Sequence, residues 1–244
     1  MGGKRAPNSP IDRLRPVLET IPLFTGLGDE DVSRIGEAAR MQRYDANAVI
    51  IERGDPADAL YAIAQGRLKV VRPRPGGRDA TLVILGPGEV FGEIAMFSDN
   101  ADGRSARVTA LKESVVMTID GRTFMDIVER SRVLSQRLLT LLANRLRDTN
   151  VHFDDMTSLE VPHRLAKKLL LLAERFGVST DDGIGITLKL SQQELGDLVD
   201  TTRQTVNRHL RAWTEAGVIR TDAGQLVIVD PDALRERADR LHEA

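Results

Sequence analysis

The spacing of hydrophobic residues divides the chain into a short helical start, a region of strands and a mainly helical second half. Residues 10–20 and 28–39 carry helical repeats, and Asp29 or Asp31 is placed to cap the second helix. From residue 48 to residue 119 the apolar positions alternate with a period of two, in short runs that Gly and Pro separate every eight to twelve residues. Many short strands at this spacing predict a small β-barrel or jelly roll.

A long helix is predicted next, from Arg130 to Met156, with Ser131 as its cap and no Pro or Gly inside it. Its apolar side is a stripe at three- and four-residue steps, formed by Leu134, Leu138, Leu141 and Leu142. A narrow apolar stripe on a long helix usually meets its own copy, so we interpret it as the spine of a homodimer. The alternative is an ordinary core helix, in which the polar positions that continue the stripe form the solvated face.

The remaining pattern is typical of a winged helix-turn-helix. A hinge is expected at residues 157–160, followed by an amphipathic helix that Gly177 stops and a turn at residues 181–185. Residues 190–199 form a helix in which Ser191 and Glu194 make a capping box. A helix at 201–213, a hairpin at 218–230 with its turn at Ala223-Gly224, and a last helix at 232–242 complete the domain.

Composition narrows the possible functions. The chain has 244 residues, 41% of them hydrophobic, which is enough for one large or two modest domains. It has no cysteine, which excludes a disulfide scaffold, a cysteine nucleophile and a cysteine-ligated cluster. No apolar run is long enough to cross a membrane, so we expect a cytoplasmic protein without a membrane partner. The net charge of −2 means that any contact with nucleic acid must come from a local patch.

The segment from residue 87 to residue 110 has the richest candidate chemistry. Arg104 and Ser105 offer a guanidinium and a hydroxyl, which suit a phosphate. Gly92 allows a backbone to approach a ligand closely, and the carboxylate of Glu93 suits a ribose hydroxyl. The alternative is a surface salt bridge between Glu93 and Arg104, a kind of pair that is common and weak.

Four segments carry a resemblance to a known family. RGDPADALYAIAQGRLKVV (53–71), PGEVFGEIAMF (87–97) and RSARVTA (104–110) resemble the cyclic-nucleotide-binding domain of the CRP/FNR family, and TTRQTVNRHLRAWTEAGVI (201–219) resembles its recognition helix and wing. The resemblance covers about residues 24–229. It implies an α+β fold with an N-terminal cyclic-nucleotide-binding β-barrel (jelly roll), a long dimerisation helix and a C-terminal winged helix-turn-helix. The expected division is a flexible leader at 1–9, the binding domain at 10–130, the dimerisation helix at 131–157 and the DNA-binding domain at 158–244.

The resemblance implies roles for individual residues. The ribose and the cyclic phosphate are expected at Gly92, Glu93, Arg104 and Ser105, with backbone contacts from Ile94 and Ala95. On the long helix, Thr149 and Asn150 are expected to reach the purine from both subunits, and Arg145 is a candidate for the same polar cluster. Asn150 stands where the family usually has Ser, and an amide both donates and accepts, so it does not separate adenine from guanine. Cyclic AMP is the favoured ligand and cyclic GMP the second choice. All four histidines follow the strand region, which argues against haem.

The second half is predicted to bind a palindromic DNA operator. The start of the recognition helix should face base edges in the major groove, with Arg203 and Arg208 as base readers and Gln204 as a partner for adenine. Side chains at helix N-termini suit phosphates, here Ser191, Gln192, Thr202 and Thr205. Further contacts to the DNA backbone are expected from Lys167, Lys168 and Arg220.

The leading hypothesis is therefore a homodimeric transcriptional regulator under allosteric control by cyclic AMP, with RNA polymerase as a further partner. A regulator that binds DNA without a nucleotide, or that answers to another ligand, is the closest alternative. An enzyme is a third reading, with Asp154-Asp155 and Asp181-Asp182 as metal ligands, but none of the usual phosphate-loop or metalloprotease motifs is present. A nucleotide-binding module of some other assembly would leave residues 191–229 unexplained.

Overall fold

The computed structural model describes residues 10–73, 80–98, 103–222 and 224–239, with side chains from residue 15 onward. Within this part the chain forms two compact units, residues 1–146 and residues 147–244. The division falls inside the long helix, whereas the expected domain limits lie at its two ends. The predicted leader, Ala223 of the predicted hairpin turn and the end of the last predicted helix lie outside the described residues.

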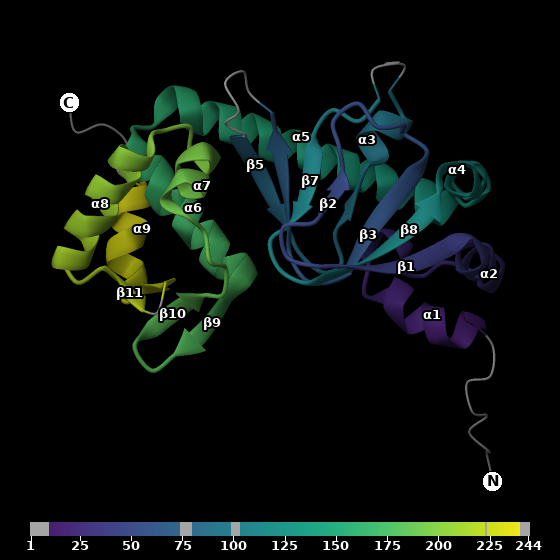
Figure 1. The fold of residues 1–244 in the computed structure, drawn as a ribbon, viewed down its shortest axis with the longest axis horizontal. Coiled ribbons are helices and arrows are strands. Elements are labelled where there is room, and N and C mark those ends of the chain that lie inside the picture. Colours follow the sequence, from purple (N-terminus) through teal and green to yellow (C-terminus); the bar gives the residue numbers. More distant parts are fainter. Residues whose placement is uncertain (1–9, 74–79, 99–102, 223, 240–244) are drawn as a thin grey trace, which may run out of the picture. The chain divides into compact units, whose positions relative to one another are not determined.

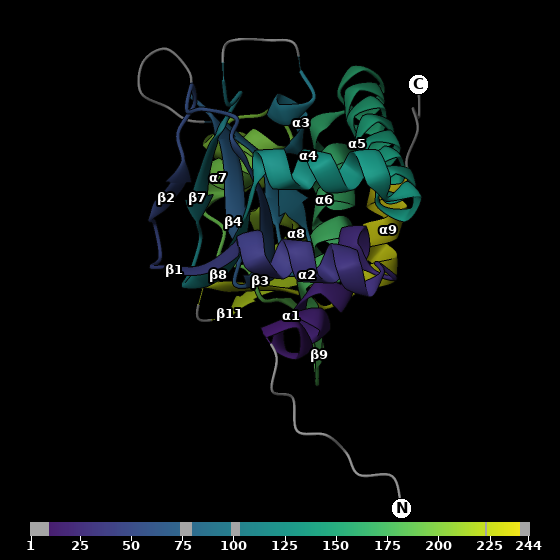
Figure 2. The same ribbon diagram turned by 90° about the vertical axis from the view of Figure 1, so that its right-hand side faces the viewer.

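The first unit begins with three helical segments, α1 (Pro10–Glu19), the short 3-10 helix η1 (Pro22–Phe24) and α2 (Asp29–Ala38). The expected cap of α2 is wrong, because Gly28 occupies the N-cap position and no side chain caps the helix. Asp29 and Asp31 lie in the first helical turn instead, where their negative charges interact favourably with the positive end of the helix dipole. Figure 2 shows α1, α2 and α4 (Gly121–Arg130) lying side by side.

Two four-stranded antiparallel sheets form the sandwich that the period-two pattern predicts. The first has the order β1 (Ala39–Tyr44), β8 (Ser114–Asp120), β3 (Ala59–Gln65) and β6 (Val90–Phe91). The second has the order β2 (Val49–Ile51), β7 (Arg107–Ala110), β4 (Leu68–Arg72) and β5 (Ala80–Leu85). Strand β1 escapes the sequence pattern because none of its residues is buried, so ARMQRY has no apolar alternation. The jelly-roll prediction is confirmed, with eight strands in two layers (Figure 1).

The long helix is α5 (Arg132–Ser158), 27 residues, and Ser131 Oγ accepts the Leu134 N–H at its start. The predicted leucine stripe packs against the core of the first unit: Leu134 and Leu138 are buried there, and Leu141 and Leu142 are partly buried. This face is therefore not a free dimer seam, and for these leucines the core-helix alternative is correct. A different apolar stripe is exposed, at intervals of seven residues: Leu139 (67%), Leu146 (63%) and Phe153 (65%).

The second unit has the predicted helix-turn-helix and a larger sheet than expected. Its helices are α6 (Val161–Phe176), α7 (Gln192–Leu198), α8 (Arg203–Glu215) and α9 (Pro231–Asp239). The sheet order is β11 (Ile219–Asp222), β12 (Gln225–Ile228), β10 (Gly183–Ile186) and β9 (Gly177–Thr180). The sequence predicts only a turn at residues 181–185, because β9 is mostly exposed and the glycines of β10 blur the alternation.

Helices α6, α8 and α9 of this unit contribute buried side chains. Leu165 and Leu169 of α6, Val206 and Trp213 of α8, and Leu234 of α9 are all buried. Helix α8 is thus buried on one face and leaves the other face to solvent. None of the described helices is long and apolar enough to cross a membrane.

Candidate functional site

Strand β6 and the short helix α3 (Glu93–Met96) meet at Gly92, whose backbone is left-handed with φ +91°. A Cβ at this position would lie 2.7 Å from Arg104 Nη1 and 3.2 Å from Tyr61 Cδ2. Glycine is therefore required twice, by the backbone conformation and by the guanidinium packed against it. Gly92 and Arg104, two of the predicted ligand residues, are therefore in direct contact.

The carboxylate of Glu93 is fully buried. Arg145, on α5, donates to Glu93 Oε1 and to the Val90 carbonyl. The second carboxylate oxygen, Oε2, is buried and has no hydrogen-bond partner within the described part of the chain. A buried carboxylate oxygen without a donor is costly, so this oxygen has an unmet demand for a hydrogen bond.

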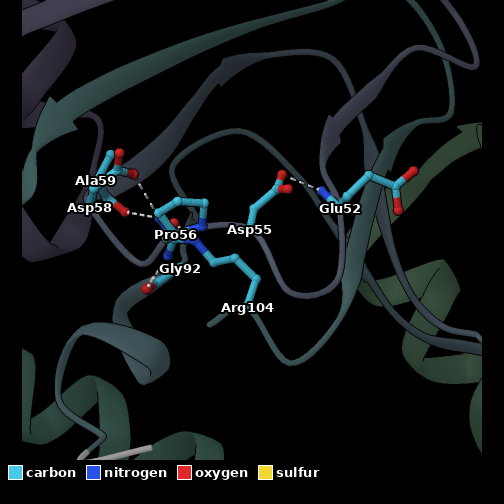
Figure 3. Close-up of polar contacts among 7 residues, drawn as sticks. All are labelled: Glu52, Asp55, Pro56, Asp58, Ala59, Gly92 and Arg104. Carbon is cyan, nitrogen blue, oxygen red and sulfur yellow. Dashed lines mark hydrogen bonds and ion pairs between the residues drawn. The ribbon is translucent and has the colours of Figure 1, made fainter. Parts of the chain in front are cut away.

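Arg104 is the most enclosed cation of the site, with 3% of its side chain exposed. Its guanidinium donates to three backbone carbonyls: Pro56 O at 3.1 Å, Gly92 O at 2.7 Å and Ala59 O at 2.7 Å (Figure 3). Asp58 Oδ1 lies 3.9 Å from Nη2. The sequence alternative of an exposed Glu93–Arg104 salt bridge is therefore wrong, because both groups are buried and each has other partners.

The backbone around Arg104 is tied to the loop before β3. Arg104 N–H donates to Asp55 O at 2.9 Å, and Gly54 N–H donates to Arg104 O at 2.8 Å. The guanidinium also lies over the Tyr61 ring, 5.4 Å from its centroid. Burial raises the pKa of Tyr61, and the charge of Arg104 opposes that rise. The hydroxyl of Tyr61 thus stays protonated at neutral pH and adds no negative charge to the site.

The other predicted ligand residues are more open. Ser105 and Ile94 are exposed, and Ala95 is half-buried. Thr149 and Asn150 are exposed positions of α5 that belong to the second compact unit. The sequence did not single out Asp58 or Tyr61, which lie in the 53–71 segment. A signal was available, because the polar GDPAD run directly precedes a buried strand.

The polar groups of this site fit the ribose and phosphate of a nucleotide. A carboxylate with one unpartnered oxygen suits a sugar hydroxyl, and a guanidinium beside a left-handed glycine suits an anionic phosphate. Neither feature depends on a residue outside the first unit.

In the second unit, α7 and α8 are joined by a tight turn. Asp200 adopts a left-handed conformation with φ +49°, and a Cβ on Gly196 would lie 2.8 Å from Thr201 O. Glycine at 196 thus lets the two helices approach closely. Ser191 forms the predicted capping box with Glu194, which confirms that prediction.

Hydroxyls at the start of both helices are used within the protein. Thr202 is the N-cap of α8: its side chain accepts the Thr205 N–H at 3.2 Å and lies 3.0 Å from the Thr205 hydroxyl. Three polar side chains near the same end of α8 are exposed: Arg203, Gln204 and Arg208. No hydrogen bond or ion pair joins Arg203 or Arg208 to another residue that the structure describes. Gln192, the first residue of α7, is half-buried.

The three further cations predicted for the DNA backbone have protein partners or are buried. Lys167 Nζ lies 2.6 Å from Asp155 Oδ1, and Arg220 Nη2 lies 2.8 Å from Asp182 Oδ2. Lys168 is mostly buried, and desolvation lowers its pKa. These pairs also account for one aspartate of each pair considered as a metal ligand. The described residues contain no group of three side chains that could hold a metal ion.

Comparison with known proteins agrees with this arrangement. Residues 41–131 match the cyclic nucleotide-binding domain, and residues 163–237 match the Crp-like helix-turn-helix domain. The chain is 31% identical over 222 residues to the CRP-like cAMP-activated global transcriptional regulator of Mycobacterium tuberculosis, covering 91% of this chain and 98% of that protein. It is also 31% identical to the Cyclic AMP receptor protein of Thermus thermophilus, over 89% and 96% of the two chains.

A solved structure has the same fold. The crystal structure of a CRP-family transcriptional regulator from Thermus thermophilus superimposes with a TM-score of 0.69 at 26% identity, over 83% of this chain and 100% of that one. The fold and the two matched domains define a DNA-binding transcriptional regulator with a cyclic nucleotide-binding domain. The chain belongs to the CRP/FNR family, which confirms the resemblance seen in the sequence, and it is not an enzyme.

Replacing Gly92 by Ala should lower the free energy of unfolding, measured by urea denaturation. The left-handed backbone alone costs an alanine about 1–2 kcal/mol, and contact with Arg104 adds to this. Gly54→Ala is the matched control, because Gly54 has φ +90° but open space at its Cβ. Equal losses in the two variants would contradict the crowding by Arg104.

Proposed function

We propose that this chain is a homodimeric transcriptional regulator, acting in the cytoplasm, whose binding to a palindromic operator is controlled by cyclic AMP. The observation that carries the ligand is the buried carboxylate of Glu93, with one oxygen unpartnered beside Gly92 and Arg104. The relatives described as cAMP-activated and as a cyclic AMP receptor support the same ligand at 31% identity.

In this proposal each polar group has one task. Glu93 Oε2 accepts a hydrogen bond from the ribose hydroxyl, while Arg104 and Ser105 hold the cyclic phosphate, with backbone contacts from Ile94 and Ala95. Thr149 and Asn150 read the edge of the purine. Because the Asn150 amide can donate or accept, cyclic GMP remains the second candidate ligand.

Arg145 links the candidate ligand site to α5. It donates hydrogen bonds to Glu93 and to the Val90 carbonyl. A ligand hydroxyl that donates to Glu93 therefore also changes the electrostatic environment of Arg145. Cyclic AMP would control DNA binding to the extent that it binds one arrangement of the dimer more tightly than another.

The exposed stripe of α5 is the surface proposed for dimerisation. Leu139, Leu146 and Phe153 are separated by seven residues, the repeat that brings side chains to one seam of a two-stranded coiled coil. Each is at least 63% exposed, which is unusual for large apolar side chains that follow one helix face.

The exposed start of α8 is proposed to read DNA. Arg203 and Arg208 suit guanine, and Gln204 suits adenine. Two copies of the helix would enter successive major grooves about 34 Å apart, which requires a palindromic site. Ser191, Gln192, Thr202 and Thr205 are proposed near phosphates, where their helix N-termini favour an anion. RNA polymerase is the expected further partner.

The deciding experiment titrates cyclic AMP into the protein by calorimetry and repeats a DNA-binding assay at fixed salt with and without the nucleotide. We expect cyclic AMP to bind and to tighten operator binding. Glu93→Gln should weaken nucleotide binding about tenfold, because a neutral amide oxygen accepts the ribose hydroxyl less strongly than a carboxylate does. If the nucleotide binds but DNA binding does not change, the nucleotide-independent alternative is favoured. The observation that supports this alternative is that the Arg104 guanidinium already donates to three backbone carbonyls.

Arg203→Ala should weaken binding to the operator by about 1–3 kcal/mol, the usual value of one bidentate contact with guanine. Arg211→Ala, on an exposed position two turns further along α8, is the control and should change operator affinity much less. Fluorescence anisotropy with operator and scrambled DNA measures both. Equal losses on the two DNAs would mean that Arg203 contacts the backbone rather than a base.

Leu146→Glu should dissociate the proposed dimer, because it places a charge in the centre of the exposed stripe. Sedimentation velocity at micromolar concentration should show the mass falling from twice the 26.9 kDa chain to that of one chain. The control is Leu171→Glu, at another exposed leucine, on α6, that is outside the stripe. A dimer that survives Leu146→Glu would exclude this face as the interface.

A further inference from the structure

We propose that Asp58 sets the charge selectivity of the nucleotide site, disfavouring a noncyclic 5′-monophosphate relative to a cyclic one. This inference rests on the proposed function, because it concerns the same ligand site. It adds a residue that neither the sequence pattern nor the expected ligand contacts include.

Asp58 acts on the guanidinium through charge rather than through position. Its Oδ1 lies 3.9 Å from Arg104 Nη2, beyond hydrogen-bond distance, while three carbonyls at 2.7–3.1 Å already fix the guanidinium (Figure 3). The Asp58 side chain is 77% exposed and that of Arg104 is 3% exposed. Removing the Asp58 carboxylate therefore leaves Arg104 in place and takes away a negative charge at its solvent side.

Among the described residues, the paired charges of the site leave no positive excess for a dianion. Two guanidiniums, those of Arg104 and Arg145, are paired with two carboxylates, those of Asp58 and Glu93. Asp55 adds a third carboxylate on the loop before β3, and it points toward Glu52 (Figure 3). The Asp55 carboxylate also has a structural task, since it accepts the Glu52 N–H at 2.8 Å. Asp58 has no such task among the described residues, where the distant ion pair with Arg104 is the one polar contact of its carboxylate.

The two kinds of nucleotide differ in charge at neutral pH. A cyclic phosphodiester carries one negative charge, whereas a phosphate monoester carries about 1.5 to 2, because its second pKa is about 6. Coulomb repulsion by Asp58 scales with the ligand's charge, so it penalises the monoester about twice as strongly on a free-energy scale. The same carboxylate thus costs cyclic AMP little and 5′-AMP more.

The experiment compares wild type, Asp58→Asn and a control, Glu113→Gln, by calorimetry with cyclic AMP and with 5′-AMP at pH 7.5. For charges about 6 Å apart in water-like surroundings, Asp58→Asn should tighten cyclic AMP about threefold and 5′-AMP about tenfold. Selectivity for the cyclic nucleotide should therefore fall about threefold. Glu113 is a suitable control because it lies far from Asp58. It directly precedes the Ser114 end of β8, whereas Ala59, next to Asp58, pairs with Asp120 at the other end. The two ends of the strand are about 20 Å apart. Glu113→Gln should change neither affinity.

A second readout uses the ligand's own titration. At pH 5 the monoester is mostly monoanionic, so the extra gain of 5′-AMP in Asp58→Asn should shrink toward that of cyclic AMP. No histidine precedes residue 152, so no side chain of the first unit ordinarily titrates between these two pH values.

The outcomes separate the two proposals. Wild-type protein that fails to bind cyclic AMP would refute the proposed function itself. Wild-type binding with an unchanged ratio of the two affinities in Asp58→Asn, with weaker binding of both nucleotides, or with an equal change in Glu113→Gln, would overturn the role of Asp58 alone.

Discussion

The arrangement of the first unit depends on the pairing of the buried Glu93 carboxylate with Arg145. A carboxylate without solvent contact is tolerated only when a cation and hydrogen bonds compensate for its lost hydration. That requirement draws α5 against β6 and α3, since the same arginine also bonds the Val90 carbonyl. Leu134 and Leu138 then complete the apolar contact on the same helix.

The order of helices and strands was predictable because it depends on local patterns in the sequence. The alternation of residues 48–119, the capping box at Ser191 and the stop of α6 before Gly177 each depend on neighbours in sequence. Apart from the cap of α2, the predictions that failed depend on partners that are distant in sequence. The leucine stripe of α5 is equally periodic whether it meets a second copy or its own domain. Strand β1 and the β9–β10 hairpin escaped because strands with exposed side chains need no apolar alternation.

The site shows the same division. Motif resemblance named Gly92, Glu93 and Arg104, and the structure gathers them, but their hydrogen bonds could not be read from spacing. Arg104 was expected only as a phosphate ligand, but its guanidinium also bonds the carbonyls of Pro56, Ala59 and Gly92. Asp58 gains importance only through this fold, because nothing in the sequence relates it to a residue 46 positions later.

The capping of α8 has a consequence for control. Thr202 closes the first turn from within the protein, and Val206 and Trp213 fix the helix to its own core. The backbone of α8 is therefore already held in place within its own domain, so little backbone entropy would be lost when the helix docks on DNA. A signal that regulates such a surface has no folding step to act on. In the proposed dimer it would instead change the distance and the angle between the two α8 helices.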